Sequence, residues 1–226
     1  MRSYLEPTAP IASQAILTDD PKGAMDLATA LCDSPRMSNL SHGLWGYGGT
    51  TQDGLEVTIQ ALGIGGPSAA AVVSELAGLG VRKAIRIGSC IALDPALEPG
   101  AILIGTRIEP RDGAGMALSG AAGVVPDAEM TAALARATGG VLGTVSSVDL
   151  ATQAPTLSES ASAWDHSSAA AIAAGAQAGI ETACALIVAE AASGEQLGRE
   201  QLDEALIALG MRAVEALVVP DQAPGA

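Results

Sequence analysis

Residues 63–89, GIGGPSAAAVVSELAGLGVRKAIRIGS, decide the fold class, because they place a helix directly before a buried strand. The segment starts with a glycine-rich turn, and its apolar residues then recur every three or four positions, as in a helix with one buried face. Those residues are Val72, Val73, Leu76 and Leu79. Gly80 ends the helix. The apolar run at 83–89 follows as a strand that carries one charge inside it, Arg86.

Outward from this unit, strand-like and helix-like segments alternate along the chain. Predicted strands lie at residues 15–18, 101–108, 141–148 and 180–190, and a hairpin over residues 45–62 turns at Asp53-Gly54. Predicted helices lie at residues 19–32, 126–140, 167–179 and 199–217. Such alternation predicts an α/β fold around a largely parallel or mixed sheet. In sheets of this kind, ligands bind at the carboxyl ends of strands.

The composition limits the classes of protein to which the chain can belong. Its 226 residues are 49% hydrophobic, which predicts a packed globular protein of one domain or two small ones. The net charge of −14 repels phosphate backbones and anionic lipids, so we expect neither nucleic acid nor membrane as a partner. No apolar run approaches the ~20 residues of a membrane span. The first ten residues, MRSYLEPTAP, lack the apolar region of a signal peptide.

Cysteine and histidine are too few and too scattered for a disulfide framework or a metal site. Cys32, Cys90 and Cys184 include no C-x-x-C pair, which favours reduced thiols and a cytoplasmic location. His42 and His166 are the only two histidines, so we expect no zinc site. We expect no metal and no cofactor, and a small molecule as the ligand.

Two features of residues 63–89 are candidates for binding an anion. The turn at residues 63–68 exposes backbone N–H groups, that of Gly65 among them, where a strand leads into a helix. It matches neither G-x-G-x-x-G nor a P-loop, so a plain tight turn explains it equally well. Arg86 is more informative, because a buried arginine needs a partner. The sequence leaves open whether that partner is a structural carboxylate or an anionic ligand.

Three acidic segments are candidates for catalysis. Asp20 is explained as a helix cap, which leaves Asp19 open to a structural or a catalytic role. The sequence WDHSS places Asp165 and His166 beside hydroxyl groups, although a capped helix N-terminus explains this segment as well. Glu190 ends an apolar strand, either as an acid in a pocket or as the first solvated residue of a loop.

Four stretches together resemble the nucleoside phosphorylase superfamily, closest to its uridine phosphorylase and hexameric purine nucleoside phosphorylase branch. Residues 63–105 resemble the centre of that family, and LTDDPKGA at residues 17–24 resembles its G-D-P-x-R segment. Residues 39–59 resemble its S-H-R segment and the hairpin that follows. GTVSSVDL at residues 143–150 resembles its S-S-D strand. The resemblance extends over residues 4–218.

The resemblance implies a fold, an activity and an assembly. The family fold is a single three-layer α/β domain with a central mixed β-sheet flanked by helices, here residues 1–226 with a disordered tail at 219–226. Family members cleave the N-glycosidic bond of nucleosides, with phosphate as the nucleophile in phosphorylases and water in nucleosidases. They form dimers or trimers of dimers with sites at subunit interfaces, so we expect a homo-oligomer. Asp149 of the S-S-D segment becomes a candidate ligand-binding residue.

The residues that hold phosphate in the family are mostly replaced in this chain. Arg86 and Ser89 match the arginine and the hydroxyl of the family's R-x-G-[ST] motif. Asp19 stands for a strand-end glycine, Gly23 for the next arginine, and Gly43 for the arginine that a neighbouring subunit supplies. Two positive charges are lost and a carboxylate is added. Since Asp19 repels phosphate, we expect no phosphorolysis.

The ribose and base positions also differ from the family pattern. The family's E-M-E ribose motif matches DHS at residues 165–167 or, alternatively, residues 181–183, and the first match keeps the following elements in place. Ser167 then replaces a glutamate that holds the ribose hydroxyls. Glu190 replaces the aspartate that assists the departing base. Ile91 fills the place of a glycine in G-S-C-G-A, which adds volume and reshapes the base pocket.

Three functions remain open. The first is hydrolysis of a nucleoside or nucleoside-like molecule, in which Asp19 or Asp165 orients water and Glu190 acts as the acid. Arg86 and Ser89 would then hold a polar group. The second is a repurposed scaffold that performs other acid/base chemistry on a small metabolite or natural-product intermediate, because fold does not dictate function. The third is a non-catalytic partner subunit or ligand sensor, for which the number of substitutions argues.

Overall fold

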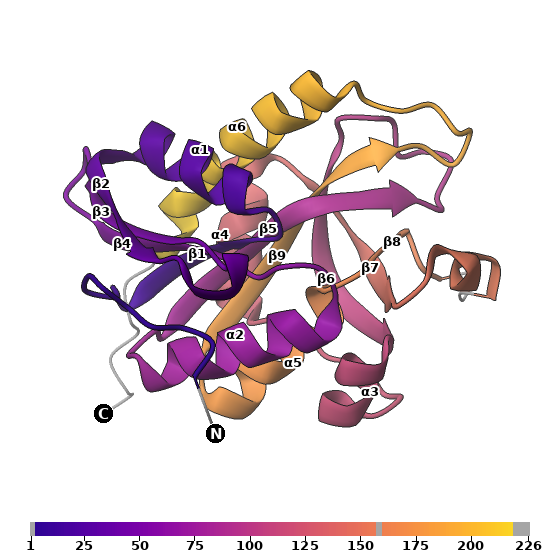
Figure 1. Cartoon of the computed structure of the whole chain (residues 1–226). Helices are drawn as coiled ribbons and strands as arrows, with labels where there is room; N and C mark the ends of the chain where they lie inside the picture. Colours follow the sequence, from indigo (N-terminus) through magenta and orange to yellow (C-terminus); the bar gives the residue numbers. More distant parts are fainter. Residues whose placement is uncertain (1–2, 157–159, 219–226) are drawn as a thin grey trace, which may run out of the picture.

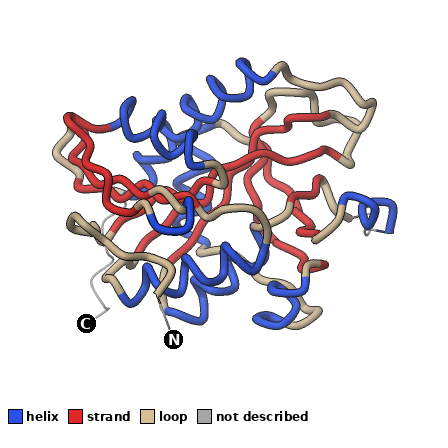
Figure 2. Tube along the Cα trace, in the orientation of Figure 1, coloured by secondary structure: helices blue, strands red, loops and turns tan. Residues whose placement is uncertain are grey.

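The computed structural model describes residues 3–156 and 160–218, and it places helices on both faces of a mixed β-sheet (Figure 1, Figure 2). The strands are β1 (Gln14–Thr18), β2 (Cys32–Asn39), β3 (Gly46–Thr51), β4 (Glu56–Ala61), β5 (Lys83–Ala92), β6 (Ile102–Arg111), β7 (Val141–Val148), β8 (Ala163–Asp165) and β9 (Glu181–Glu190). The α-helices are α1 (Pro21–Leu31), α2 (Gly66–Gly78), α3 (Gly113–Ser119), α4 (Ala128–Thr138), α5 (Ser168–Ala178) and α6 (Arg199–Leu217). Two short 3₁₀ helices are η1 (Ser41–Gly43) and η2 (Ala151–Thr156). The predicted α/β fold is confirmed. The predicted tail at residues 219–226 lies outside the described residues.

The sheet is open at one side and closed at the other. Its strand order is β2-β3-β4-β1-β5-β8-β7-β6-β9, and β5 also pairs with β9. The strand β5 therefore has three neighbours: β1 and β9, both parallel, and β8, antiparallel at Ile91 and Ala92. This extra pairing closes five strands into a ring. The ring encloses an apolar core that includes Cys90, Leu103, Ile108, Val145, Cys184 and Leu186.

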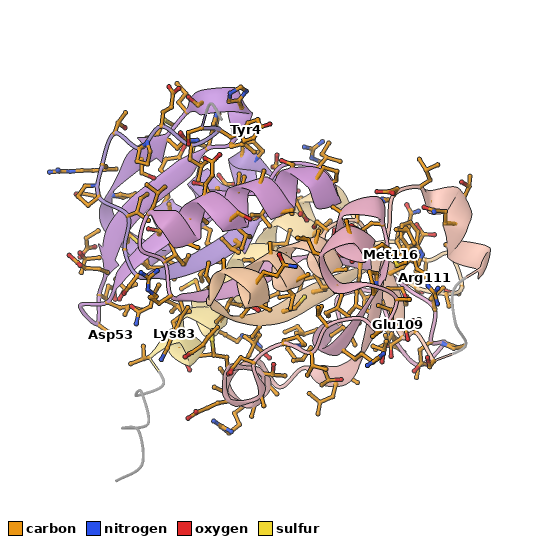
Figure 3. All side chains as sticks on the ribbon, turned by 90° about the horizontal axis from the view of Figure 1, so that it is seen from below. Tyr4, Asp53, Lys83, Glu109, Arg111 and Met116 are labelled. Carbon is orange, nitrogen blue, oxygen red and sulfur yellow. The ribbon has the colours of Figure 1, made fainter. Side chains whose placement is uncertain are left out.

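The helices divide between the two faces of the sheet. The helices α1, α4 and α6 bury their apolar sides on one face, in a core with β1, β4, β5 and β9. The helices α2 and α5 cover the other face, where they lie side by side (Figure 3). The helix α3 packs beside them. Because both faces are covered, the inner strands are apolar on both sides. No helix in residues 3–156 and 160–218 is both long and apolar enough to cross a bilayer.

Most elements agree with the sequence prediction, and the exceptions have local causes. The hairpin of β3 and β4 turns at Asp53-Gly54 as predicted, with Gly54 at φ 83°. The sequence did not predict the two 3₁₀ helices, nor the strands β2 and β8 and the helix α3, which are polar, very short or glycine-containing. The prediction that Leu79 belongs to a buried face is wrong: α2 ends at Gly78, and Leu79 is 38% exposed.

The parallel strands β1, β5 and β9 bring distant acidic and basic side chains to one edge of the sheet. Asp19 directly follows β1, and Glu190 is the last residue of β9. Arg86 lies on the central strand β5, in register with Leu17 of β1 and Cys184 of β9. Residues that are far apart in the chain, such as Asp19 and Glu190, therefore lie at the same edge of the sheet.

Candidate active site

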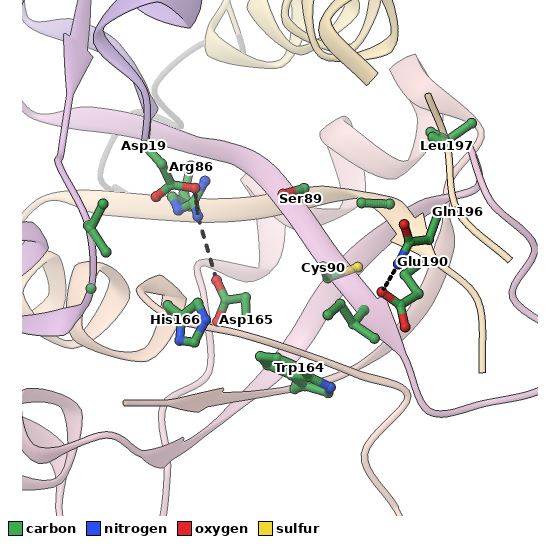
Figure 4. Close-up of a pocket in the computed structure, with 14 residues that line it drawn as sticks. Asp19, Arg86, Ser89, Cys90, Trp164, Asp165, His166, Glu190, Gln196 and Leu197 are labelled. Carbon is green, nitrogen blue, oxygen red and sulfur yellow. Dashed lines mark hydrogen bonds and ion pairs between the residues drawn. The ribbon is translucent and has the colours of Figure 1, made fainter. Parts of the chain in front are cut away.

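A pocket of about 420 Å³ opens at the carboxyl ends of β1, β5 and β9 (Figure 4). The pocket brings together most of the residues that sequence analysis selected, although they come from five separate parts of the chain. They are Asp19, Gly65, Arg86, Ser89, Ile91, Asp165, His166 and Glu190. The pocket is therefore the candidate active site.

Arg86 lies at the inner end of the pocket with 1% of its side chain exposed. One terminal nitrogen, Nη2, donates to Oδ2 of Asp19 at 2.7 Å and to Oγ of Ser167 at 2.9 Å. The same nitrogen lies 3.6 Å from Oδ2 of Asp165. The other terminal nitrogen, Nη1, donates to the carbonyl oxygen of Ile87. Among the described residues, Nε of Arg86 has no hydrogen-bond partner.

Gly88 makes this conformation of Arg86 possible. Residues two apart on a strand point to the same side, so the arginine side chain folds back over position 88. A Cβ atom on Gly88 would overlap the guanidinium group. The glycine in the R-I-G-S sequence thus provides the space that the buried guanidinium needs.

Asp19 faces both Arg86 and the pocket. Its Oδ1 accepts a hydrogen bond of 2.9 Å from the Ser167 hydroxyl, and its side chain is 36% exposed. Burial raises the pKa of the Asp19 carboxyl, the Arg86 guanidinium opposes that effect, and the neighbouring Asp165 adds to it. A carboxyl group with a raised pKa is a stronger base once it is ionised.

Asp165 is buried, at 4% exposure, and its oxygens are already bonded within the protein. Oδ1 accepts from the Ser147 hydroxyl at 2.5 Å, and Oδ2 accepts from the Ser168 hydroxyl at 2.5 Å. Oδ2 also accepts from the Ser168 backbone N–H at 3.0 Å, at the start of α5. Asp165 thus accepts the first backbone N–H of α5, although Ser167 is the N-cap residue, and the same carboxylate faces Arg86.

Two carboxylates surround one guanidinium in this cluster. Burial alone would lower the pKa of Arg86, but Asp19 and Asp165 outweigh it and hold that pKa above its ordinary value. The guanidinium therefore stays charged, and its charge is balanced inside the protein. Among the described residues that line the pocket, Arg86 is the single lysine or arginine.

His166 is the exposed member of the group. Its Nδ1 lies 2.7 Å from the carbonyl oxygen of Val148, and since a carbonyl only accepts, Nδ1 carries a hydrogen. In the neutral ring Nε2 is then an acceptor. The ring contacts Trp164 edge-on, with centroids 5.4 Å apart. These two contacts fix the orientation of the imidazole at the pocket wall.

Glu190 lies at the other end of the pocket from Asp19 (Figure 4), and Ile91 also lines the pocket. Glu190 and Ile91 are paired in the register of β5 and β9, just after a bulge at Cys90 and Ile91. Ile91 also pairs with Trp164 of β8. Oε2 of Glu190 accepts a 2.8 Å hydrogen bond from Nε2 of Gln196. The carboxyl group of Glu190 thus lies beside the apolar side chains of Ile91 and Trp164 in the pocket lining.

Two predicted ligand-binding residues do not line the pocket. Ser167 is 1% exposed and lies behind Asp19 and Arg86, where its hydroxyl joins the two. Asp149 accepts instead from the backbone N–H of Gly113, at the start of α3, at 2.9 Å. The expectation that Asp149 lines the pocket is therefore wrong: β7 ends at Val148, and Asp149 instead bonds the start of α3. From the S-S-D segment, Ser147 donates to Asp165, which does line the pocket.

The two segments that could match the ribose motif lie in different parts of the structure, and the one at residues 181–183 is at the amino end of β9. Glu181 begins β9 and lies 3.7 Å from Nζ of Lys83, the first residue of β5 (Lys83 is labelled in Figure 3). Both residues are therefore at the amino ends of their strands, opposite the pocket. Of the two segments, only residues 165–167 contribute side chains to the pocket, namely those of Asp165 and His166.

Six further residues line the pocket that the sequence did not single out as site residues. They are Ile64, Cys90, Trp164, Ala189, Gln196 and Leu197. Trp164 and Cys90 are adjacent to selected residues, whereas Gln196 reaches the pocket only through a loop fold that no local pattern reveals. Burial raises the pKa of the Cys90 thiol far above its ordinary value, so Cys90 is no thiolate nucleophile.

In the described part of the chain, the cysteines and the acidic side chains are not grouped as metal ligands. Cys32, Cys90 and Cys184 are free and buried, as the lack of a C-x-x-C pair indicates. Among the residues that the structure describes, no group of three or more His, Cys, Asp or Glu side chains is arranged to hold a metal ion.

Comparison with known proteins relates this chain to a family. The family model described as "Phosphorylase superfamily" matches residues 14–218. The uridine phosphorylase of Escherichia coli (strain K12) is 37% identical over 105 residues, which are 46% of this chain and 41% of that protein. A DeoD-type purine nucleoside phosphorylase of Oceanobacillus iheyensis is 37% identical over 84 residues, 37% of this chain and 35% of the relative. The guanosine phosphorylase of Halorubrum lacusprofundi is 35% identical over 101 residues, 44% and 40% of the two chains. The aligned segments thus span less than half the length of these relatives.

Proposed function

Because the chain belongs to the phosphorylase superfamily, we propose that it cleaves the N-glycosidic bond of a nucleoside or nucleoside-like small molecule by hydrolysis rather than phosphorolysis. The names of the relatives, which are uridine, purine nucleoside and guanosine phosphorylases, support a nucleoside as the ligand. The local structure around Arg86 supports water as the nucleophile.

The observation that carries the proposal is the ion pair of 2.7 Å between Arg86 and Asp19. The Asp19 carboxylate occupies the position beside the guanidinium that an oxyanion of phosphate would need. A phosphate ion would have to displace Asp19 and would then meet a second carboxylate, Asp165, 3.6 Å from the same nitrogen. Like charges this close repel strongly in a partly desolvated site. Water meets no such barrier.

The proposed reaction uses the two ends of the pocket in different roles. Asp19, the more exposed of the two carboxylates at the Arg86 end, orients a water molecule and accepts its proton. The water oxygen forms a bond to the anomeric carbon while the bond from that carbon to the base nitrogen breaks. Glu190 accepts a hydrogen bond from the departing base, and the leaving nitrogen of the base takes its proton from a second water molecule. Arg86 and Ser89 hold polar groups of the ligand, and Asp165 keeps Arg86 in place.

Product analysis with a panel of nucleosides, with and without phosphate, tests this proposal. We expect release of free base and free ribose at a rate that phosphate does not increase. Formation of ribose 1-phosphate, or base release only in the presence of phosphate, would contradict the proposal.

A second candidate function is acid/base chemistry on another small metabolite, without glycosidic cleavage. The observation that favours it is His166, whose Nδ1 is bonded to Val148 so that Nε2 is available as a base. Ile91 and Trp164 would form the apolar wall of such a site. If no nucleoside binds by calorimetry, this candidate replaces hydrolysis, and His166→Ala and Glu190→Gln should then both reduce turnover of the true substrate.

We also propose that the chain forms a homo-oligomer. Ile64 at the pocket is 92% exposed and Leu40 is 60% exposed, and a partner subunit would remove such side chains from water. Size-exclusion chromatography with light scattering should give a dimer or a larger assembly at micromolar concentration. A monomer across that range would contradict this part of the proposal.

A further inference from the structure

Gln196 reaches the pocket through a tight loop that follows β9. The backbone N–H of Ala191 donates to the carbonyl of Glu195 at 2.8 Å, and that of Leu197 donates to Ala189 at 2.9 Å. Residues 190 and 196 form an antiparallel bridge, and Gly194 makes the turn at φ 86°. The loop is therefore a short hairpin, and Leu197 attaches it to the core. This hairpin holds the side chain of Gln196 next to that of Glu190.

The hydrogen bond between the two side chains fixes the direction of the amide. Nε2 of Gln196 lies 2.8 Å from Oε2 of Glu190. An ionised carboxylate only accepts, so the nitrogen and not the oxygen of the amide must face it. The Gln196 amide keeps a second N–H, and Glu190 keeps Oε1 as an acceptor. The pair thus places a hydrogen-bond acceptor beside a hydrogen-bond donor at one end of the pocket (Figure 4).

An acceptor beside a donor matches one kind of base edge. An amino group next to a ring imine nitrogen, as in a 4-aminopyrimidine or a 6-aminopurine, offers a donor and then an acceptor. The corresponding oxo bases offer an acceptor and then a donor, which would set a carbonyl oxygen against the Glu190 carboxylate. A site built for one set of donors and acceptors rejects a ligand that leaves its groups unpaired.

We propose that Gln196 is a positioning residue that holds Glu190 toward the pocket, and that the pair selects ligands whose base carries an amino group beside a ring imine nitrogen. This inference rests on the proposed function, in that the ligand is a nucleoside or a related molecule. To that proposed function, the inference adds the class of base that the site selects and a role for Gln196.

Calorimetry with matched bases and nucleosides tests the selection on the full chain. Among the bases, cytosine is compared with uracil and adenine with hypoxanthine. Among the nucleosides, cytidine is compared with uridine and adenosine with inosine. The amino compound should bind on the order of 10-fold more tightly in at least one pair, as expected for one mismatched hydrogen-bond pair. Equal affinity of the amino and the oxo compound in every pair, or no binding of any compound, overturns the inference.

Variants of the pair separate positioning from simple structural support. Gln196→Leu should bring the ratio of amino to oxo affinities close to 1. The exchange Glu190→Gln with Gln196→Glu keeps the hydrogen bond between the side chains but replaces the donor at position 196 by an acceptor. This double variant should fold as the wild type does and lose the preference for amino bases. Glu195→Gln, an exposed neighbour in the same hairpin, is the control that should retain it.

The two proposals fail in different ways. If the double variant retains the preference, the pair supports only the hairpin and the inference is overturned. If amino bases bind preferentially but ribose release depends on phosphate, the hydrolysis proposal fails and the inference stands. If ribose is released without phosphate and without preference for amino bases, the inference alone fails.

Discussion

At the residue scale, the function of the pocket depends on how the charge of one buried arginine is balanced. Arg86 has two carboxylates within ion-pair distance, at 2.7 and 3.6 Å, and a hydroxyl at 2.9 Å. Removing one partner from a buried ion pair is usually more costly than the pair was worth, because the remaining charge is left uncompensated. The arrangement thus resists the loss of either acid, and it leaves little attraction for an external anion.

The close approach of Arg86 to Gly88 predicts that even a methyl group at position 88 disrupts the cluster. Gly88→Ala should lower the free energy of unfolding by about 1–3 kcal/mol, because the added carbon overlaps the guanidinium in a fully packed region. Urea denaturation measures the loss. Gly78→Ala is the matched control: its Cβ meets open space at the end of α2, so it should be neutral or stabilise by up to about 1 kcal/mol. Equal effects at the two positions would contradict the account of Gly88.

At the scale of elements, the N-terminal segment is attached to α2 by a single carboxylate. Glu75 accepts from the backbone N–H groups of Tyr4 and Leu5, at 2.9 and 2.7 Å, and from the hydroxyl of Ser3 at 2.7 Å. Leu5 is buried at 3% exposure, and Tyr4 packs edge-on against His42. The segment therefore covers part of the core between α2 and η1.

This attachment should weaken in acid. Partial burial alone would raise the pKa of Glu75, but the hydrogen bonds from Tyr4, Leu5 and Ser3 outweigh it and lower that pKa. A lowered folded-state pKa means that the stabilisation is present above the unfolded pKa of about 4.3 and is lost as pH falls through the folded value. Glu75→Gln should lose about 0.5–1.5 kcal/mol at pH 7 and little at pH 3.

Hydrogen exchange at the amides of Tyr4 and Leu5 locates the effect of Glu75→Gln. Both amides should exchange faster in the variant at pH 7, whereas amides in the α2–α5 interface should not change. Unchanged exchange at Tyr4 and Leu5 would show that Glu75 does not hold the segment.

The sequence predicts those helices and strands whose own residues show a clear apolar period or a turn signal. The helix over residues 66–78 and the strands β5 and β9 have clear apolar periods, and the β3–β4 hairpin has an Asp-Gly turn. The strand β2, CDSPRMSN, has no apolar alternation and carries the turn-favouring residues Asp33, Ser34 and Pro35 inside it. It is a strand because it pairs with β3. Likewise, β8 has three residues and exists only between β5 and β7.

For the candidate site, too, the sequence predicted residues that stand out in a local pattern but not the partners that the fold brings to them. Arg86 was selected because a charge in an apolar strand needs a partner, and the structure supplies Asp19 as that partner. The local sequence does not indicate which carboxylate pairs with Arg86, because β1 and β5 become neighbours only in the folded sheet. Gln196 was missed for the same reason, since only the hairpin after β9 brings it to Glu190.

At the scale of the whole molecule, the chain buries acidic groups despite its net charge of −14. Asp112 is the clearest case, with 0% exposure at the junction of α3 with α2 and α5. Its Oδ2 accepts from Gly115 N–H at 2.7 Å, while its Oδ1 has no hydrogen-bond partner among the described residues. Burial raises the pKa of Asp112, and the Gly115 bond opposes that effect.

The burial of Asp112 predicts a change in global stability with pH. Because its folded-state pKa lies above the unfolded value of about 3.9, the stabilisation from the neutral form is fully present below pH 3.9 and is lost as pH rises through the folded pKa. Asp112→Asn removes the charge and keeps an oxygen that can cap α3. It should raise the free energy of unfolding by about 1 kcal/mol at pH 8 and have less effect at pH 4. Thermal unfolding at the two pH values measures this, and a loss of stability at pH 8 would contradict it.

The central claim is that Asp19 occupies the position of an anion beside Arg86, and calorimetry of phosphate binding tests it most directly. The wild-type protein should show no binding of inorganic phosphate at millimolar concentration. Asp19→Gly should bind phosphate at least about 10-fold more tightly, because the guanidinium loses its nearest carboxylate. Asp20→Ser, which removes the adjacent charge and keeps a cap for α1, should behave as the wild type. Equal phosphate affinity in the wild type and in Asp19→Gly would contradict the claim.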